Sequence, residues 1–159
     1  MGRIRIVWGT ATAPTAMASY DAALAAANVH NYNLVAVSSV VPADADIEVA
    51  GTAPDLGPAG ERLTVVEGRT TVPPEEDRSA AAALGWARDS DGPGIFYEVS
   101  GSDPDAVEKR LDAGLDAGLE LREWDCDVTG HRVVHADADP GEYTTALVLA
   151  VYGDSDPLL

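Results

Sequence analysis

The sequence is poor in the residues on which several common kinds of site depend. It has one cysteine, Cys126, which leaves no partner for an internal disulfide, and three histidines. Two of these, His131 and His135, lie four residues apart in a segment that reads as a strand, so they share one face. Without a His-Glu-x-x-His pattern or a cysteine pair, we interpret them as structural and expect no metal site.

Other absences narrow the classes of function. There is no glycine-rich phosphate loop, no Gly-x-Ser-x-Gly elbow and no Cys-x-x-Cys pair. The one lysine, Lys109, falls on the polar face of an expected helix, so a Schiff-base lysine is not expected. No apolar run reaches the roughly 18 residues of a membrane-spanning helix. The apolar stretch that ends at Trp8 and Gly9 is too short for a signal-peptide core. We therefore expect a cytoplasmic protein with no membrane segment.

Basic residues are also scarce. The chain of 159 residues has 27 acidic and 10 basic side chains, a net charge of -17, which argues against a nucleic-acid partner. The acids are spread along the chain and do not form a tail, so they indicate an acidic folded surface. Few lysines on such a surface are typical of haloarchaeal proteins, in which salt screens the repulsion; an acidic mesophilic protein is the alternative.

The length and an apolar content of 46% suit one folded domain, 1–159. Hydrophobic patterning predicts helices at 15–28, 75–88 and 102–119. It predicts strands at 3–10, 34–41, 62–67, 94–99, 121–128, 132–136 and 144–152. Residues 43–61 read as a long loop and the last eight as a frayed tail. Helices and strands mix without regular alternation, which predicts an α+β fold with helices outside the sheets.

One polar pair interrupts the expected strand 34–41. Ser38 and Ser39 lie between apolar residues, where a hydroxyl costs free energy unless it is hydrogen-bonded. Taken alone the pair is weak evidence of function, because backbone groups often satisfy serine.

The surroundings of this pair resemble the pyruvoyl-dependent arginine decarboxylases. The matching segments are 20–24 (Tyr-Asp-Ala-Ala-Leu), 33–42 (Asn-Leu-Val-Ala-Val-Ser-Ser-Val-Val-Pro), followed by Asp44, Asp46 and Ile47, and 94–98 (Gly-Ile-Phe-Tyr-Glu). Residues 118–124 also look like the passage from helix to strand in that family. The resemblance extends from about residue 5 to residue 152, and its most specific part is the Asn-Leu…Ser-Ser…Pro segment.

The resemblance implies a layered α/β/β/α sandwich and a self-cleaving proenzyme. In such proteins the hydroxyl of the second serine, here Ser39, attacks the carbonyl of the first, here Ser38. A β chain 1–38 and an α chain 39–159 result, and the α chain begins with a pyruvoyl group derived from Ser39. We expect a strained backbone to assist the attack.

The implied activity is decarboxylation of L-arginine to agmatine and CO₂ for polyamine synthesis. The pyruvoyl ketone would form an imine with the substrate and act as the electron sink. The resemblance also implies a homotrimer, or a hexamer formed from two trimers, with sites between neighbouring subunits. A related enzyme for another amino acid, or an unprocessed relative without activity, are the alternatives.

The places of three further residues in the expected helices and strands suggest a role for each. Glu98, in an apolar strand, is expected to be buried and protonated, and to return a proton to the substrate α-carbon; the alternative is a structural carboxylate. Asp21 would pair with the substrate guanidinium, unless it is a plain surface acid on a helix. Asn33 would position the cleavage site or the substrate, unless it is a turn residue before a strand.

Overall fold

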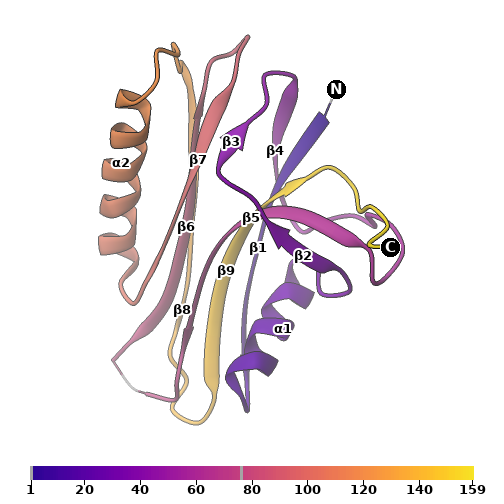
Figure 1. Cartoon of the computed structure of the whole chain (residues 1–159). Helices are drawn as coiled ribbons and strands as arrows, with labels where there is room; N and C mark the ends of the chain where they lie inside the picture. Colours follow the sequence, from indigo (N-terminus) through magenta and orange to yellow (C-terminus); the bar gives the residue numbers. More distant parts are fainter. Residues whose placement is uncertain (1, 76) are drawn as a thin grey trace.

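The structure is a computed structural model that describes residues 2–75 and 77–159. Two β-sheets lie face to face, and one helix covers the outer face of each sheet (Figure 1). From one side to the other the layers are therefore helix, sheet, sheet and helix. The α+β class and the α/β/β/α arrangement predicted from the sequence are confirmed.

The first sheet has five strands in the order β2-β5-β9-β1-β4. Their bounds are β1 (Gly2–Ala13), β2 (Asn33–Ala36), β4 (Ala45–Gly51), β5 (Arg62–Val72) and β9 (Tyr143–Tyr152). The sheet is mixed, because β1 pairs antiparallel with β9 but parallel with β4, and β2 pairs parallel with β5. Strand β9 is apolar on both faces, as expected for a strand that is covered on both sides.

The second sheet has four strands in the order β3-β7-β6-β8, and every neighbouring pair is antiparallel. Their bounds are β3 (Val40–Val41), β6 (Ser79–Arg88), β7 (Gly94–Gly101) and β8 (Val128–Asp137). The short β3 forms one edge and pairs with only the beginning of β7.

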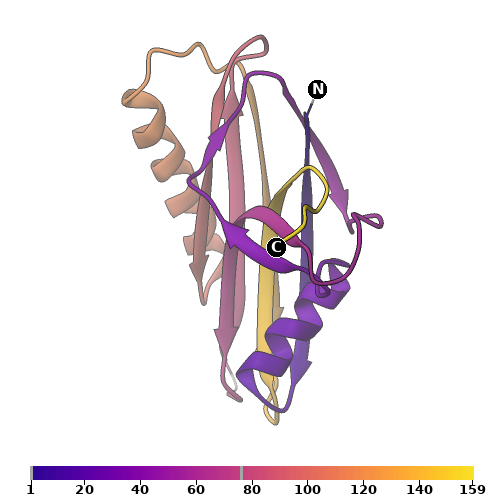
Figure 2. The ribbon, with the colours of Figure 1, turned by 45° about the vertical axis from the view of Figure 1, so that its right-hand side comes forward.

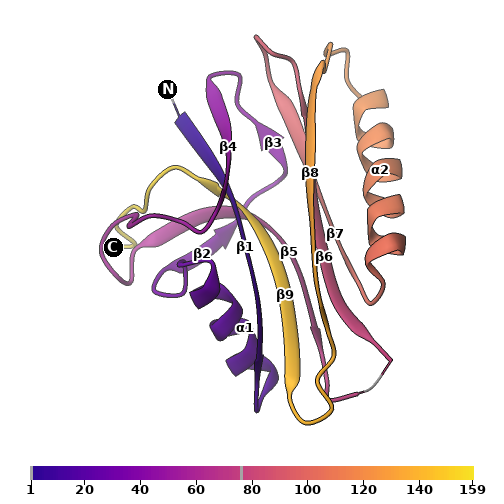
Figure 3. The same cartoon turned by 180° about the vertical axis from the view of Figure 1, so that it is seen from behind.

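Both helices begin at side-chain caps that the sequence supplies. Helix α1 (Ala16–Ala26) is capped by Thr15, whose hydroxyl accepts from the Ala18 N–H at 3.1 Å. Helix α2 (Pro104–Glu120) is capped by Asp103, which accepts from the Asp105 N–H at 3.0 Å. Helix α1 packs on the first sheet and α2 on the second, at opposite sides of the molecule (Figure 3).

Three apolar layers hold the four structural layers together. The central layer, between the sheets, includes Ile6, Val66, Ala82, Leu84, Phe96, Val134, Ala146 and Val148. The layer beneath α1 includes Val7, Ala23, Leu24, Leu63, Leu147 and Leu149, and that beneath α2 includes Ala81, Ala83, Val99, Val107 and Leu111. Alternate residues of one strand thus serve two different layers.

The predicted helix at 75–88 is wrong over most of its length, because residues 79–88 form strand β6; Glu76 lies outside the described residues. The alanines that favour a helix here face both ways from a central strand. Ala80 and Ala82 enter the layer between the sheets, while Ala81 and Ala83 lie under α2. Burial on both faces overrides the intrinsic helix preference of alanine.

Other segments also differ from expectation. The predicted loop 43–61 contains β4, and 121–128 is irregular up to the start of β8 at Val128. The predicted strand 34–41 is two strands in different sheets. The C-terminal residues are not frayed throughout, because Asp156 and Arg62 exchange two backbone hydrogen bonds. Among the residues that the structure describes, no helix is both long and apolar enough to cross a membrane.

Candidate active site

The Ser38–Ser39 pair lies where the chain passes from one sheet to the other. Strand β2 ends in the first sheet, and β3 begins in the second (Figure 2). The Val37 N–H donates to the Val65 carbonyl at 3.0 Å, and the Phe96 N–H donates to the Ser39 carbonyl at 2.8 Å. The crossing segment is therefore anchored to both sheets, one residue before the pair and at its second serine.

A tight turn is centred on Ser39. The Val40 N–H donates to the Ser38 carbonyl oxygen at 2.9 Å, which closes a three-residue γ-turn. Over residues 2–75 and 77–159 the non-glycine residues with left-handed backbone are Asn28 and Asp77. The turn is thus of the inverse type, a local energy minimum, and neither a positive φ nor a cis peptide bond marks strain at the pair.

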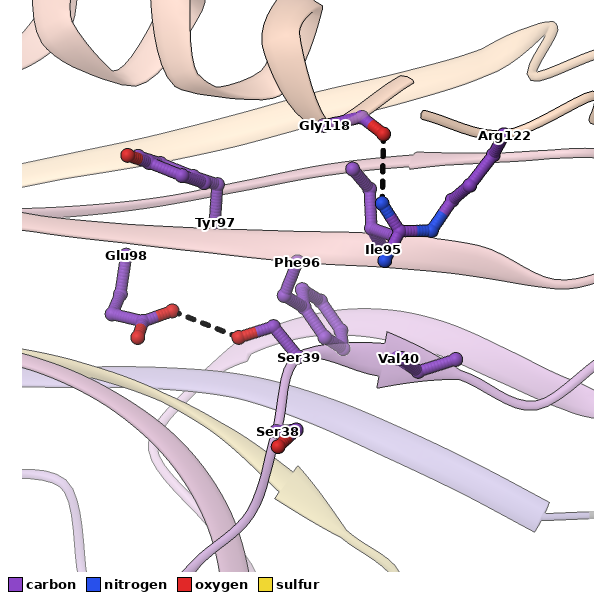
Figure 4. Close-up of a pocket in the computed structure, with 9 residues that line it drawn as sticks. All are labelled: Ser38, Ser39, Val40, Ile95, Phe96, Tyr97, Glu98, Gly118 and Arg122. Atoms are coloured by element: carbon purple, nitrogen blue, oxygen red, sulfur yellow. Dashed lines mark hydrogen bonds between the residues drawn. The ribbon is translucent and has the colours of Figure 1, made fainter. Parts of the chain in front are cut away.

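The Ser39 hydroxyl donates a hydrogen bond to Oε2 of Glu98 at 3.0 Å (Figure 4). The pairing of β3 with β7 produces this contact, because Val40 lies opposite Ile95 and the Glu98 side chain is three residues further along β7. Glu98 is exposed, so the predicted burial of its side chain is wrong for the single chain. Strand β3 pairs with only Gly94 and Ile95, and the Ser39 carbonyl takes the Phe96 N–H, so no strand covers this edge of β7 beside Glu98.

Tyr152, at the end of β9, approaches the same segment from the first sheet. Its hydroxyl donates to the Val40 carbonyl at 2.8 Å, and its ring meets Phe96 edge to face at 6.1 Å between centroids. Burial, and secondly the negative charge of Glu98, raise the pKa of Tyr152 to about 12. The phenol therefore stays protonated at neutral pH and acts as a donor.

These groups border a cavity of about 390 Å³. Its lining residues, drawn in Figure 4, are Ser38, Ser39, Val40, Ile95, Phe96, Tyr97, Glu98, Gly118 and Arg122. Arg122 donates to the Gly118 carbonyl at 2.7 Å, and its guanidinium lies 5.5 Å from the centre of the Trp124 ring. The cavity is thus mainly apolar and holds one carboxylate and one guanidinium.

Two predicted site residues lie elsewhere in the single chain. Asp21 is exposed on α1, which covers the outer face of the first sheet (Figure 1), whereas the cavity is lined by β7, the end of α2 and the cleavage segment. Asn33, at the start of β2, donates from Nδ2 to the Gly60 carbonyl at 2.7 Å and so holds the loop before β5. The structure therefore brings Ser38, Ser39 and Glu98 together, but neither Asp21 nor Asn33 joins them.

Beside Asp21 lies a separate polar cluster. The Tyr20 hydroxyl donates to Oε2 of Glu67 at 2.8 Å, and the Arg69 guanidinium lies 4.4 Å from the centre of the Tyr20 ring. Burial, followed by the contact with Glu67, raises the pKa of Tyr20 to about 12. The described residues contain no group of three or more His, Cys, Asp or Glu side chains placed to hold a metal ion. The expectation of no metal site stays a prediction.

The arrangement of these groups fits nucleophilic chemistry by a serine of the chain. A serine hydroxyl points to a carboxylate that can accept its proton, and the carbonyl of the preceding residue already accepts a main-chain hydrogen bond. No lysine takes part, since Lys109 is exposed on α2. These features define a class of proteins in which a serine hydroxyl next to a carboxylate can act on the carbonyl of the residue before it.

Comparisons with known proteins identify the family of this chain. The family model "Pyruvoyl-dependent arginine decarboxylase (PvlArgDC)" matches residues 3–157. This chain belongs to the pyruvoyl-dependent arginine decarboxylase family.

Relatives with that name occur in two strains of Halobacterium salinarum. Each is 53% identical over 160 residues, which cover 99% of this chain and 98% of the relative. A further relative, "Pyruvoyl-dependent arginine decarboxylase" from Methanocaldococcus jannaschii, is 29% identical over 126 residues, 78% of this chain and 74% of its own. The family recognised from the Ser-Ser segment is confirmed, and the acidic, lysine-poor composition agrees with the halobacterial relatives.

Proposed function

We propose that this protein is a single-domain proenzyme that cleaves itself between Ser38 and Ser39 and then decarboxylates L-arginine to agmatine and CO₂. The observation that carries the proposal is the 3.0 Å hydrogen bond from the Ser39 hydroxyl to the Glu98 carboxylate. The membership of the family and the names of the relatives support arginine as the substrate.

In the proposed cleavage, Glu98 accepts the hydroxyl proton while the Ser39 oxygen attacks the Ser38 carbonyl carbon. The Ser38–Ser39 C–N bond breaks, the nitrogen takes up a proton, and an ester replaces the amide. Loss of the Ser39 α-proton then expels the Ser38 carboxylate and leaves a dehydroalanine. Its imine tautomer adds water and releases ammonia, which leaves a pyruvoyl group at the start of chain 39–159.

The pyruvoyl group supplies an electron sink for the electrons left behind when CO₂ departs. The chain's own residues do the rest. The Phe96 N–H, 2.8 Å from the Ser39 carbonyl oxygen, holds the backbone at residue 39 in place. Ile95 and Phe96 line the cavity with apolar surface, which keeps water away from the reacting atoms. Glu98, protonated during turnover, would return a proton to the substrate α-carbon.

Recognition of the substrate guanidinium is assigned to Asp21, and a second copy of the chain would have to supply it. This fits the trimer or hexamer with sites between subunits that the family resemblance implies. Val35, Val37 and Val40, each at least 40% exposed, surround the cleavage segment and would be covered by such a neighbour. Asn33 would then act by holding the chain before the cleavage segment. The cytoplasmic location stays a prediction.

Intact-mass spectrometry of the denatured protein, beside a Ser39→Ala variant, tests the proposal. We expect two fragments, 1–38 and a pyruvoyl-capped 39–159, from the parent chain and one uncut species from the variant. A parent chain that stays whole on long incubation in high salt would indicate an inactive relative.

Once cleavage is established, release of CO₂ from L-arginine, L-lysine and L-leucine, which has no cationic end, identifies the class of substrate. The Asp21→Ala variant should lose activity with arginine. If it keeps that activity, or if the parent chain prefers a substrate without a cationic end, the substrate is another amino acid.

A further inference from the structure

The oxygen of the Ser38 carbonyl has a donor in place before any reaction begins. We propose that the main-chain N–H of Val40 is the oxyanion donor of the self-cleavage reaction. It stabilises the negative charge that develops on the Ser38 oxygen when the Ser39 hydroxyl adds to that carbonyl. This inference rests on the proposed function and assigns a catalytic group to its first step.

The distance agrees with that role. The Val40 nitrogen lies 2.9 Å from the Ser38 oxygen, and oxyanion donors in acyl transfer act at about 2.7–3.1 Å from the charged oxygen. The turn that sets this distance is centred on Ser39. One short segment therefore carries the nucleophile, and its two flanking peptide groups supply the electrophile and the donor.

The strand pairing leaves this N–H available. Along a strand, the N–H and C=O of one residue point to the side opposite those of the next residue. The Ser39 carbonyl points to β7, where it accepts from the Phe96 N–H. The Val40 carbonyl points the other way and accepts from the Tyr152 hydroxyl at 2.8 Å. The Val40 N–H consequently also faces away from β7 and does not take part in the ladder.

Tyr152 acts on this turn as a positioning residue. Its hydroxyl fixes the Val40 carbonyl, and its ring packs against Phe96 in the core between the sheets. Val40 is thus held from the side opposite β7, which keeps its N–H directed at Ser38.

The balance of charge also calls for a donor at this oxygen. Before the attack, the negative charge is on Glu98, where the Ser39 hydroxyl stabilises it. When Glu98 takes the proton, that charge moves to the Ser38 oxygen and the hydrogen bond from the hydroxyl is lost. The net charge of the site does not change, so a donor at the new position replaces the one at the old position.

Two variants that remove the N–H in different ways test the proposal. In the first, α-hydroxyisovaleric acid replaces Val40, so that an ester oxygen replaces the N–H and the side chain is kept. In the second, Val40→Pro removes the N–H and keeps a strong amide acceptor at Ser39; an edge strand tolerates proline where the N–H faces away from the ladder. Val40→Ala, which keeps the N–H, is the matched control. Circular dichroism establishes that each variant folds.

The rate of appearance of fragment 1–38 is followed by mass spectrometry. We expect both variants without the N–H to cleave about 100-fold more slowly than Val40→Ala, the loss typical of one oxyanion donor. Hydroxylamine, which converts the ester at Ser38 into a hydroxamate, separates the steps. Trapping in Val40→Pro should be slowed as much as cleavage itself, because the donor acts on ester formation.

Three results would overturn the proposal. If either folded variant cleaves as fast as Val40→Ala, the N–H is not needed, although self-cleavage stands. If hydroxylamine traps the ester at the control rate while cleavage is slow, the loss lies in the elimination step. If the parent chain does not cleave at all, the proposed function fails and this inference fails with it.

Discussion

At the scale of single residues, Glu98 has two proposed tasks that need opposite protonation states. It accepts a proton from the Ser39 hydroxyl during cleavage and returns one to the substrate during turnover. Glutamine keeps a hydrogen-bond acceptor at this position but cannot take the proton. We expect Glu98→Gln to slow self-cleavage by about 10²–10⁴-fold, the usual contribution of a general base.

The loss is measured as the rate of appearance of fragment 1–38 by mass spectrometry. Glu108→Gln, which removes a carboxylate of α2 that lies 3.2 Å from the His131 ring of β8 and away from the cleavage segment, is the matched control and should cleave at the parent rate. If the Glu98→Gln chain cleaves as fast as this control, some other group takes the Ser39 proton.

Tyr20 and Tyr152 make the stability depend on pH at the alkaline end. The pKa of each is raised to about 12 in the folded chain, mainly by burial, whereas that of an unfolded tyrosine is about 10. The folded state therefore holds protons that the unfolded state releases. This contribution is fully present below about pH 10 and is lost as the pH rises through about 12.

Denaturant titrations at about pH 9 and pH 11.5, in constant high salt, measure the effect. We expect the unfolding free energy of the parent chain to fall between these values, and that of a Tyr20→Phe/Tyr152→Phe double variant to fall less. An equally steep fall in the double variant would assign the alkaline loss to other groups. Both tyrosines are partly exposed, so solvent screening keeps the effect small.

At the scale of the elements, the contact between β1 and α1 depends on one missing side chain. A Cβ placed on Gly9 would collide with the Ala23 carbonyl oxygen of α1, and backbone cannot yield as a side-chain end can. We expect Gly9→Ala to lower the unfolding free energy by about 1–3 kcal/mol, as overpacking does.

Gly2→Ala, on the same strand, is the control for this substitution, because a Cβ there meets nothing within 4 Å. Denaturant unfolding of the two variants makes the comparison. Equal stabilities would mean that α1 can move away from β1 without cost.

Helix α2 was predicted correctly because its signals are local in the sequence. Helix α2 has a capping aspartate, a proline in its first turn and an apolar stripe, and all three depend only on neighbours in the sequence. Strand β6 has none of these. Its alanines favour a helix locally, and only the second sheet and α2, which bury its two faces, make it a strand.

The candidate site was likewise predictable only where the signal is local in the sequence. Ser38, Ser39 and Glu98 were found because a family motif runs through them. Tyr152 and Arg122 were not given roles, because they reach the cleavage segment from β9 and from the end of α2, far away in the sequence. Exposure of Glu98 could not be foreseen either, because it follows from the shortness of β3.

At the scale of the whole molecule, a net charge of -17 destabilises the compact state through self-repulsion, most strongly in dilute salt. On α2, Asp112, Asp116 and Glu120 are exposed and spaced by four, so they repel one another along one ridge. The last two also lie near the negative end of the helix dipole. We expect Asp116→Asn to raise the unfolding free energy by about 0.2–0.5 kcal/mol for each repulsive pair removed, at low salt.

Asp105→Asn is the matched control on the same helix. Asp105 lies in the first turn, where negative charge is favourable, and four residues before Lys109. Its replacement should therefore destabilise. The unfolding free energies of the two variants and the parent chain are measured in about 0.1 M and about 3 M KCl. Each variant's difference from the parent should shrink in the stronger salt, because the screening length becomes shorter. Effects of the same sign, or effects that persist in strong salt, would contradict this account of the ridge.

The position of β1 has a consequence for the order in which the molecule can be made. Residues 1–38 contribute β1 to the interior of the first sheet, between β9 and β4, and both of these neighbours belong to 39–159. Before cleavage, folding is a first-order process within one chain. After the proposed cleavage, the native state would be a complex of two chains, and recovery from denaturant would require the two chains to meet. The refolding yield of the cleaved protein should therefore rise with protein concentration, whereas that of the uncut Ser39→Ala chain should not. The proposed self-cleavage would therefore leave a fold that each molecule reaches efficiently only once, before its chain is cut.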